Sequence, residues 1–151
     1  MGTHYKGNKK ETTALNTYIK LIRAAESLNA RVKVSLSDAG LTESQFNILD
    51  ALLHLGSLSQ KDLGNKLLKS GGNITMVVDN LEKRGLVKRE RGKEDRRYFT
   101  VHLTKQGKQL IEKIFPFQIE AIVNELSVLN ESEQAELQRL CKTVGTRKKE
   151  K

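Results

Sequence analysis

One change of periodicity constrains the fold of this chain more than any other feature of its sequence. Apolar residues recur at the three- and four-residue spacing of amphipathic helices before residue 85, and they do so again after Thr104. In between, two short runs at 86–90 and 98–103 have the character of strands, and a polar, basic loop at 91–97 separates them. The sequence therefore predicts a mainly α fold of the α+β kind, with a single β-hairpin set among helices.

The predicted helices before the hairpin suggest a helix-turn-helix. Thr42 with Gln45 forms a capping box, Ser59 can cap a short helix, and the apolar stripe of the next helix leads to a terminal glycine, Gly85. The expected helices before the hairpin lie at about 12–37, 42–54, 59–69 and 70–84. After the hairpin, helix is expected throughout 105–145, with a proline kink at 116 and a new cap at Asn130. We expect a single domain, 1–151, with a winged helix-turn-helix core at 41–103 and dimerisation helices at 12–37 and 105–145.

The positive charge is concentrated in one internal stretch and two tails. The chain of 151 residues has a formal net charge of +9. Residues 83–97 contain eight basic and three acidic residues, whereas the rest of the chain between the tails is close to neutral. A local field of this kind attracts a polyanion such as DNA.

The solvent face of the helix at 70–84 can be assigned from its core stripe. At 100° per residue, Ile74, Val77, Val78 and Leu81 share one side. Asparagine can read adenine, and threonine or methionine can contact a thymine methyl group. Asp79 on the opposite face is predicted either to accept from cytosine or to pair with Lys83. The predicted DNA-binding residues, including those of the wing, are Ser70, Gly72, Asn73, Thr75, Met76, Asn80, Lys83, Lys93, Asp95, Arg96 and Arg97.

Three segments resemble the MarR family of winged helix-turn-helix transcriptional regulators. They are 70–87 (SGGNITMVVDNLEKRGLV), 94–97 (EDRR) and 101–107 (VHLTKQG). The resemblance implies a cytoplasmic homodimer that binds a pseudo-palindromic DNA operator, usually as a repressor released by a small aromatic or lipophilic effector. It also implies that Arg97 enters the minor groove and that Asp95 holds it, whereas Arg96 stands where the family varies.

We place the expected effector between the first, second and fifth helices, in a largely apolar pocket. His54 could line that pocket, although a favourable position at the end of its helix explains it equally well.

Other functions find little support in the sequence. A nucleophile–base motif, a phosphate loop, metal-ligand spacing and a long apolar span are all missing, so we expect no enzyme, no cofactor, no metal site and no membrane partner. We expect Cys141, on the apolar face of the last helix, to be buried and inert. Two alternatives stay open, namely a winged-helix module that binds an acidic protein and a small-molecule sensor that does not bind DNA.

Overall fold

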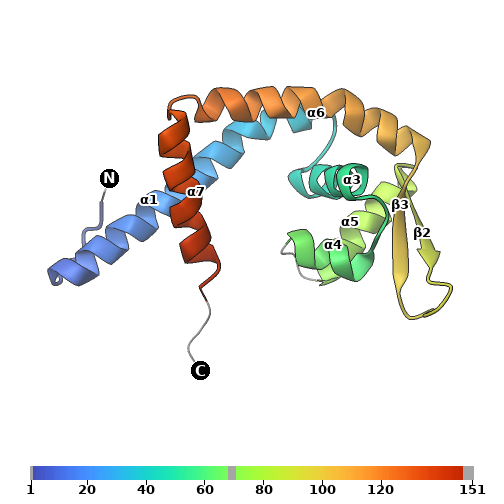
Figure 1. The fold of residues 1–151 in the computed structure, drawn as a ribbon, viewed down its shortest axis with the longest axis horizontal. Coiled ribbons are helices and arrows are strands. Elements are labelled where there is room, and N and C mark those ends of the chain that lie inside the picture. The colour runs from blue at the N-terminus through green and yellow to red at the C-terminus, as the bar shows by residue number, and fades with distance from the viewer. Residues whose placement is uncertain (1, 68–70, 148–151) are drawn as a thin grey trace.

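The computed structural model describes residues 2–67 and 71–147. Its elements, in chain order, are α1 (Lys9–Val32), α2 (Val34–Asp38), α3 (Glu43–Leu55), β1 (Leu58–Ser59), α4 (Gln60–Leu67), α5 (Gly71–Lys83), β2 (Val87–Arg91), β3 (Phe99–Leu103), α6 (Lys105–Leu126) and α7 (Glu131–Gly145). The mainly α fold with a hairpin wing is confirmed. Figure 1 shows α6 running along one side of the molecule, with α1 and α7 at one end and the helix-turn-helix and wing at the other.

The first helix differs from its prediction at both ends. It begins at Lys9, three residues early, because Asn8 and Glu11 form a capping box: the Asn8 Oδ1 accepts from the Glu11 amide at 2.9 Å, and the Glu11 Oε2 accepts from the Asn8 amide at 3.0 Å. The helix also breaks at Lys33, so that its last turn becomes the separate helix α2. The apolar spacing continues across this break, which is why the sequence pattern did not reveal it.

The sheet has three strands rather than the two that were predicted. β1 pairs antiparallel with β3, and the strand order is β1-β3-β2. β1 contains only Leu58 and Ser59, which is too short for an alternating pattern to be visible in the sequence. The pairing fixes the β3 edge of the wing to the segment between α3 and α4. The predicted cap is also present, since the Ser59 Oγ accepts from the Asp62 amide at 3.0 Å.

The core lies within the helix-turn-helix, the wing and the first half of α6, and Leu36 of α2 also belongs to it. The predicted inward stripe of α5 is confirmed, because Ile74, Val78 and Leu81 are all buried. They pack with residues of α3 and with Ile111 and Ile114 of α6 in one continuous cluster. The winged-helix core therefore contains part of α6 as well as residues 41–103.

The start of α6 explains why threonine and glycine stand three residues apart there. The Thr104 Oγ1 accepts from the Gly107 amide at 3.0 Å and donates to the Gly85 carbonyl at 2.7 Å, so one hydroxyl caps α6 and ties it to the end of α5. A Cβ atom on Gly107 would lie 2.0 Å from the Leu86 carbonyl oxygen, which excludes any larger residue. The motif thus fixes the wing against α6.

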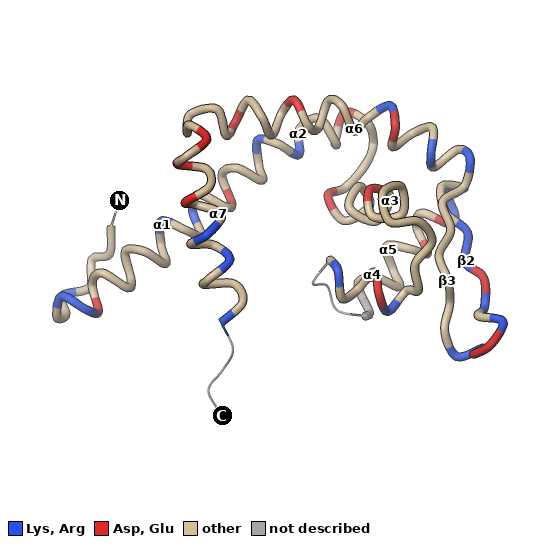
Figure 2. Tube along the Cα trace, viewed as in Figure 1, with Lys and Arg blue, Asp and Glu red and all other residues tan. Residues whose placement is uncertain are grey.

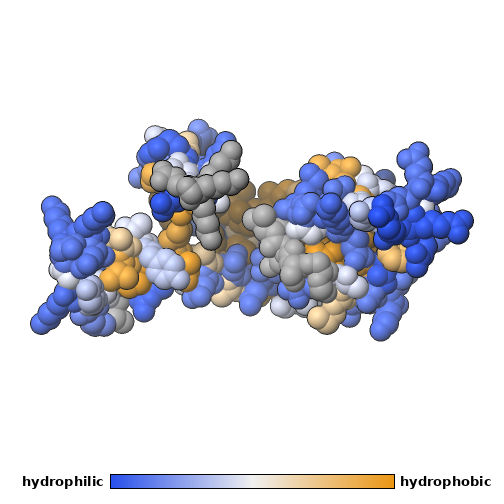
Figure 3. Space-filling view, turned by 90° about the horizontal axis from the view of Figure 1, so that it is seen from below, coloured by the Kyte–Doolittle hydropathy of each residue, from blue (hydrophilic) through white to orange (hydrophobic). Residues whose placement is uncertain are grey.

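The flanking helices leave much of their apolar surface uncovered. α7 contains no buried residue, and exposed apolar side chains on α1, α6 and α7 include Leu15, Tyr18, Phe117, Val123, Leu140 and Val144. Figure 3 shows apolar side chains on the α1 side of the molecule and a hydrophilic surface at the wing end. Cys141 is exposed, so the prediction of a buried thiol is wrong for the single chain. Its helix face is apolar, as predicted, but no part of the described chain covers it.

Candidate nucleic-acid interface

The solvent face of α5 carries most of the residues predicted to read bases. Asn73, Thr75, Asn80 and Lys83 are exposed, and Met76 is 66% exposed despite its apolar side chain. Gly72 lies in the first turn of α5, and Ser70 lies outside the described residues. The predicted contact of Met76 with a thymine methyl therefore stays a prediction, and its exposed side chain is free of the protein core.

Two side chains of this face are held in place by the preceding helices. The Thr75 Oγ1 accepts from the Gln60 Nε2 at 2.7 Å, and the Asn80 Oδ1 accepts from the Gln45 Nε2 at 2.7 Å. Gln45 is the residue that closes the capping box of α3, through its Oε1 and the Thr42 amide at 2.9 Å. The first turns of α3 and α4 therefore set the orientation of α5, and a base contact by Asn80 would use its amide nitrogen.

Asp79 has a structural partner that the sequence did not suggest. Its carboxylate pairs with the Arg89 guanidinium on β2 and not with Lys83. Arg89 also reaches Glu82: its main-chain N–H donates to Glu82 Oε2 at 2.8 Å, and its Nη2 lies 3.4 Å from Glu82 Oε1. The predicted pairing with Lys83 is wrong, and Asp79 joins α5 to the wing.

The wing loop is a compact turn. The Gly92 amide donates to the Tyr98 carbonyl at 2.9 Å, and the Arg91 Nη1 donates to the Arg96 carbonyl at 2.8 Å. A Cβ atom at Gly92 would come within 2.6 Å of the Asp95 carbonyl oxygen, so the turn requires glycine there. The predicted loop at 91–97 is thus closed by hydrogen bonds within itself, and one of them holds the Arg91 side chain.

Asp95 and Arg97 form a two-pronged ion pair at the tip of this loop. The Arg97 Nε and Nη2 donate to Asp95 Oδ1 and Oδ2 at 3.0 and 2.8 Å, and the Arg97 amide donates to Oδ1 at 3.1 Å. These bonds hold the pKa of the Asp95 carboxyl below its ordinary value, and the carboxylate raises the pKa of Arg97. The Arg97 side chain is nevertheless 81% exposed. The predicted pairing is confirmed: Asp95 fixes the plane of a guanidinium that remains open to solvent.

The remaining basic residues surround this pair. Lys93 and Arg96 are exposed on the loop, and Arg91 stacks over the Phe99 ring with its Cζ 4.9 Å from the ring centroid. Figure 2 shows the lysines, arginines and acids of β2 and the loop following one another along the hairpin, which projects beyond the helices. Within the described residues, no group of histidine, cysteine, aspartate and glutamate is arranged to hold a metal ion. No helix in the same ranges is long and apolar enough to cross a membrane.

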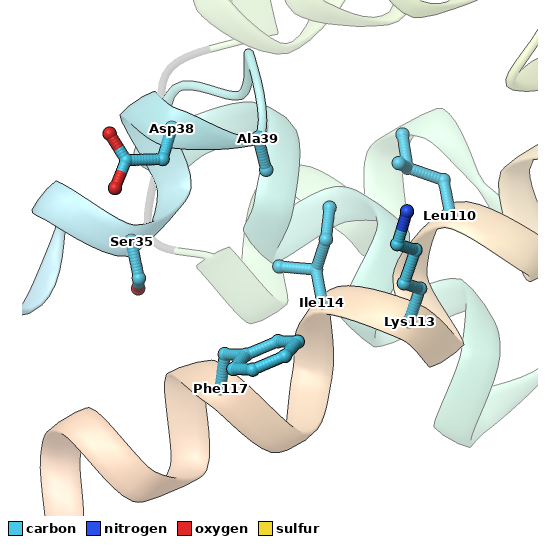
Figure 4. A pocket seen from close by; sticks show the side chains of 7 residues that line it. All are labelled: Ser35, Asp38, Ala39, Leu110, Lys113, Ile114 and Phe117. Carbon is cyan, nitrogen blue, oxygen red and sulfur yellow. The ribbon is translucent and has the colours of Figure 1, made fainter.

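Cavities lie where the flanking helices meet the winged-helix core. One, of about 320 Å³, lies between α1, α3 and α6 and is lined by Val32, Leu36, Phe46, Phe115 and Ile122 among others. This is the region in which the sequence placed an effector. A second, of about 420 Å³, lies between α2 and α6, and Figure 4 shows Ile114 and Phe117 rising from α6 toward α2. The buried Gln118 lines the first cavity and Ser35 lines the second, and the hydrogen bond that joins them, 2.8 Å long, lies between the two spaces.

A helix-turn-helix with an exposed second helix, followed by a basic hairpin that carries an oriented arginine, defines a winged helix-turn-helix protein of the DNA-binding class. Residues 41–99 match the model of the MarR family. The chain is 34% identical over 137 residues to the HTH-type transcriptional regulator MhqR of Bacillus subtilis, covering 91% of this chain and 94% of that protein. The chain therefore belongs to the MarR family of transcriptional regulators.

Solved structures agree with this assignment. The crystal structure of NadR in complex with 4-hydroxyphenylacetate is 28% identical, with a TM-score of 0.72, and the alignment covers 98% of this chain and all of that one. AbsC, a MarR family regulator from Streptomyces coelicolor, has the same fold, with a TM-score of 0.80 at 22% identity over 93% of this chain and 95% of that one.

Proposed function

We propose that this regulator binds a pseudo-palindromic operator in double-stranded DNA as a homodimer, with α5 in the major groove and the wing in the adjacent minor groove. One observation carries the proposal: Arg97 is fixed by Asp95 yet stays open to solvent, on a wing that Arg89 ties to the exposed face of α5. A guanidinium prepared in this way suits a narrow minor groove, where the negative potential is strongest. The contact set is the one predicted above, and its described members lie on α5 and on the wing loop.

The uncovered apolar faces of α1, α6 and α7 support the dimer. Residues such as Tyr18, Phe117 and Val144 are 63%, 61% and 63% exposed in the single chain, which is unfavourable unless another surface covers them. A second copy related by a two-fold axis is the simplest partner. The axis also places two copies of α5 about one DNA turn apart, roughly 34 Å, as a palindromic site requires. In this arrangement 12–37 and 105–145 are the dimerisation helices.

The regulator acts in the cytoplasm as a repressor that a small aromatic or lipophilic molecule releases, and it catalyses no reaction. The cavity between α1, α3 and α6 supports this step, because its lining is mostly apolar and comes from both the flanking helices and the winged-helix core. The NadR complex, with 4-hydroxyphenylacetate bound to a relative that aligns over its whole length, points in the same direction. A ligand shifts the equilibrium only if it binds the DNA-incompetent arrangement more tightly.

The decisive experiment combines DNA selection with a measurement of assembly. Fragments that the purified protein selects from genomic DNA are sequenced, and the best site is titrated by fluorescence anisotropy at two salt concentrations with competitor DNA present. Sedimentation at micromolar concentration gives the oligomeric state. A dimer that prefers a two-fold symmetric site supports the proposal. A stable monomer, or equal affinity for all sequences, contradicts it and favours a protein-binding or sensor role.

A further inference from the structure

The wing carries a second fixed arginine, Arg91, which is not among the residues predicted to bind DNA. The sequence placed Arg91 in the polar loop, but β2 extends to it, and it pairs with Phe99 across the hairpin. The Arg91 Cζ lies 4.9 Å from the centroid of the Phe99 ring, and its Nη1 donates to the Arg96 carbonyl oxygen at 2.8 Å. Two contacts from the opposite side of the hairpin therefore hold the guanidinium of Arg91.

These two contacts order the Arg91 side chain without neutralising it, because a carbonyl oxygen and an aromatic ring are both uncharged. Arg91 is exposed, and no carboxylate within residues 2–67 and 71–147 forms an ion pair with it. Arg97 differs in this respect, since the Asp95 carboxylate matches its charge. Arg91 thus keeps its full positive charge on a side chain that has already lost much of its rotamer freedom, which favours the binding of an anion.

Arg91 projects from the side of the wing that faces α5. Alternate residues of a strand share a face, so Arg91 lies on the same side of β2 as Arg89, which pairs with Asp79 and Glu82 of α5. The Phe99 ring supports this placement, because the Arg89 Cζ also lies near it, 5.7 Å from its centroid. Figure 1 shows the hairpin beside α5 and extending past it at the tip. Arg91 is therefore the next residue toward the tip on the α5 side of the wing.

This side of the wing is where the DNA backbone would pass in the proposed complex. With α5 in the major groove and the wing in the adjacent minor groove, the sugar–phosphate strand that separates the two grooves runs between them. Arg89 is poorly placed to bind this strand, because its side chain is only 19% exposed and its charge is matched by Asp79 and Glu82. The two acids outnumber Arg89, so Arg91 supplies the positive charge that a phosphate needs on this side.

We propose that Arg91 is a further DNA-binding residue, which binds a phosphate of the strand between the two grooves, and that Phe99 is its positioning residue. The proposal rests on the proposed function for the docking of α5 and the wing, and it adds a backbone contact outside the predicted set. A guanidinium has five N–H groups, and the Arg96 carbonyl accepts from one nitrogen of Arg91. The remaining donors can bind phosphate oxygens in the two-pronged manner typical of arginine. Contacts of this kind fix the position of a protein on the duplex and carry no base preference of their own.

The test measures the salt dependence of DNA binding by the full-length protein. Fluorescence anisotropy is recorded at several salt concentrations with two labelled duplexes, the best site from the selection experiment and one of unrelated sequence. Arg91→Met removes the charge and keeps an unbranched side chain that can cover the Phe99 ring. We expect it to bind both duplexes about tenfold more weakly per half-site. The slope of log affinity against log salt concentration should fall by about one per protomer.

Lys88→Met is the matched control for Arg91→Met. It removes one positive charge from the same strand, but on the opposite face, where Lys88 pairs with Glu90 at 3.2 Å. We expect its salt slope to stay close to that of the wild type. Circular dichroism at the assay temperature shows whether each variant is folded.

Phe99→Leu tests the positioning role, because it changes no charge. It should leave the salt slope unchanged and weaken DNA binding about threefold, since Arg91 must then be ordered when DNA binds. In the Arg91→Met background, Phe99→Leu should have no further effect. A merely structural role of Phe99 would weaken binding equally in both backgrounds, so this double-mutant cycle separates the two roles.

Modified DNA identifies the phosphate itself. Methylphosphonate, which is uncharged, replaces one phosphate at a time in each half of the best site. The wild type should lose affinity at a phosphate of the strand between the two grooves, and Arg91→Met should lose none at that position.

An unchanged salt slope for Arg91→Met would overturn the proposal. An equal loss for Lys88→Met, or a methylphosphonate profile that Arg91→Met shares with the wild type, would do the same. In these cases operator binding stands, because the wild type still selects its site. If Arg91→Met lowers the slope but the wild type binds both duplexes equally, the backbone contact stands and the proposed operator is wrong. If the wild type binds no duplex DNA even at low salt, both are wrong.

Discussion

Arg89 connects α5 to the wing. The substitution Arg89→Ala should show how much this connection contributes to the free energy of unfolding. The Arg89 side chain is only 19% exposed, and it pairs with Asp79 and Glu82, which are 44% and 40% exposed. It also lies over the Phe99 ring, with its Cζ 5.7 Å from the centroid. Truncation removes the cation and leaves two acids of neighbouring helical turns facing the strand without it.

The size of the effect follows from this partial burial. A hydrogen bond to a charged group contributes about 1.5–3 kcal/mol, whereas a fully exposed ion pair contributes about 0–1 kcal/mol. Because both acids are partly in solvent, we expect Arg89→Ala to lower the free energy of unfolding by about 2 kcal/mol. Lys88→Ala on the same strand is the control. Its ion pair with Glu90, at 3.2 Å, joins side chains 67% and 51% exposed, and its loss should cost less than about 0.5 kcal/mol.

The assay is urea denaturation followed by circular dichroism, with all variants at one protein concentration because the stability of a dimer depends on concentration. A double-mutant cycle with Asp79→Ala should give a coupling energy of at least about 1 kcal/mol. Equal stabilities of Arg89→Ala and Lys88→Ala would refute the reasoning. Asp79→Asn should weaken binding to all operator variants together. A changed preference at one base pair alone would show instead that Asp79 reads cytosine.

Three further predictions concern the wing and the core. Arg97→Ala should weaken operator binding about tenfold to a hundredfold per half-site and relax an A·T preference at the operator edges. Lys93→Ala should weaken binding to all DNA sequences alike and lower the slope of log affinity against log salt concentration by about one per protomer. Anisotropy titrations at two salt concentrations compare the two variants. Asp95→Ala removes an acid beside DNA yet should weaken binding, because Arg97 loses its orientation; tighter binding in the same titrations would make the wing an unstructured basic patch. Because the pKa of Asp95 is lowered in the folded protein, its pair with Arg97 is fully formed above the ordinary carboxyl pKa of 3.8 and is lost only as the pH falls through the lower value. Carboxyl resonances followed by NMR should therefore show Asp95 ionised throughout pH 5–8.

The sequence could predict those parts of the fold that are encoded locally. The capping boxes at Thr42 and Asn130 and the inward stripe of α5 depend on residues three or four positions apart, and all appear as expected. The pairing of Asp95 with Arg97 is equally local, since they stand two positions apart in one turn. Patterns of this length are visible in a single sequence because the geometry of a helix or turn brings their members together.

The remainder depends on contacts that no local pattern encodes. One of the two roles predicted for Asp79 was a pair one turn along its own helix, but its partner is on β2, ten residues away, in a position that only the packed hairpin creates. The short strand β1 exists because β3 is beside it. Cys141 lies on an apolar face, as predicted, but it is exposed, because nothing within residues 2–67 and 71–147 covers it.

The hydrogen bonds of the winged-helix core limit how an effector can act on DNA binding. α5 is tied to α3 by Gln45, to α4 by Gln60 and to β2 by Arg89, while the Thr104 hydroxyl joins its end to α6. A ligand would have to break several of these bonds to reshape the DNA-reading surface itself. The connections to the flanking helices are weaker. α1 is interrupted at Lys33, and α6 lacks one main-chain hydrogen bond at Pro116.

These two breaks lie close to one another in space, because α2 begins directly after Lys33 and its Ser35 donates to Gln118, two residues beyond Pro116. The cavity between α1, α3 and α6 lies beside these breaks. Asn29 and Val32 line it from the flanking helices, and Phe46 lines it from the winged-helix core. A ligand held there contacts both the flanking helices and the winged-helix core, at the place where the two breaks weaken the connection between them. The ligand would therefore change the distance between the two winged-helix cores in the proposed dimer. A separation that no longer matches one DNA turn is sufficient for release, since each α5 can then enter the major groove only if the other leaves it.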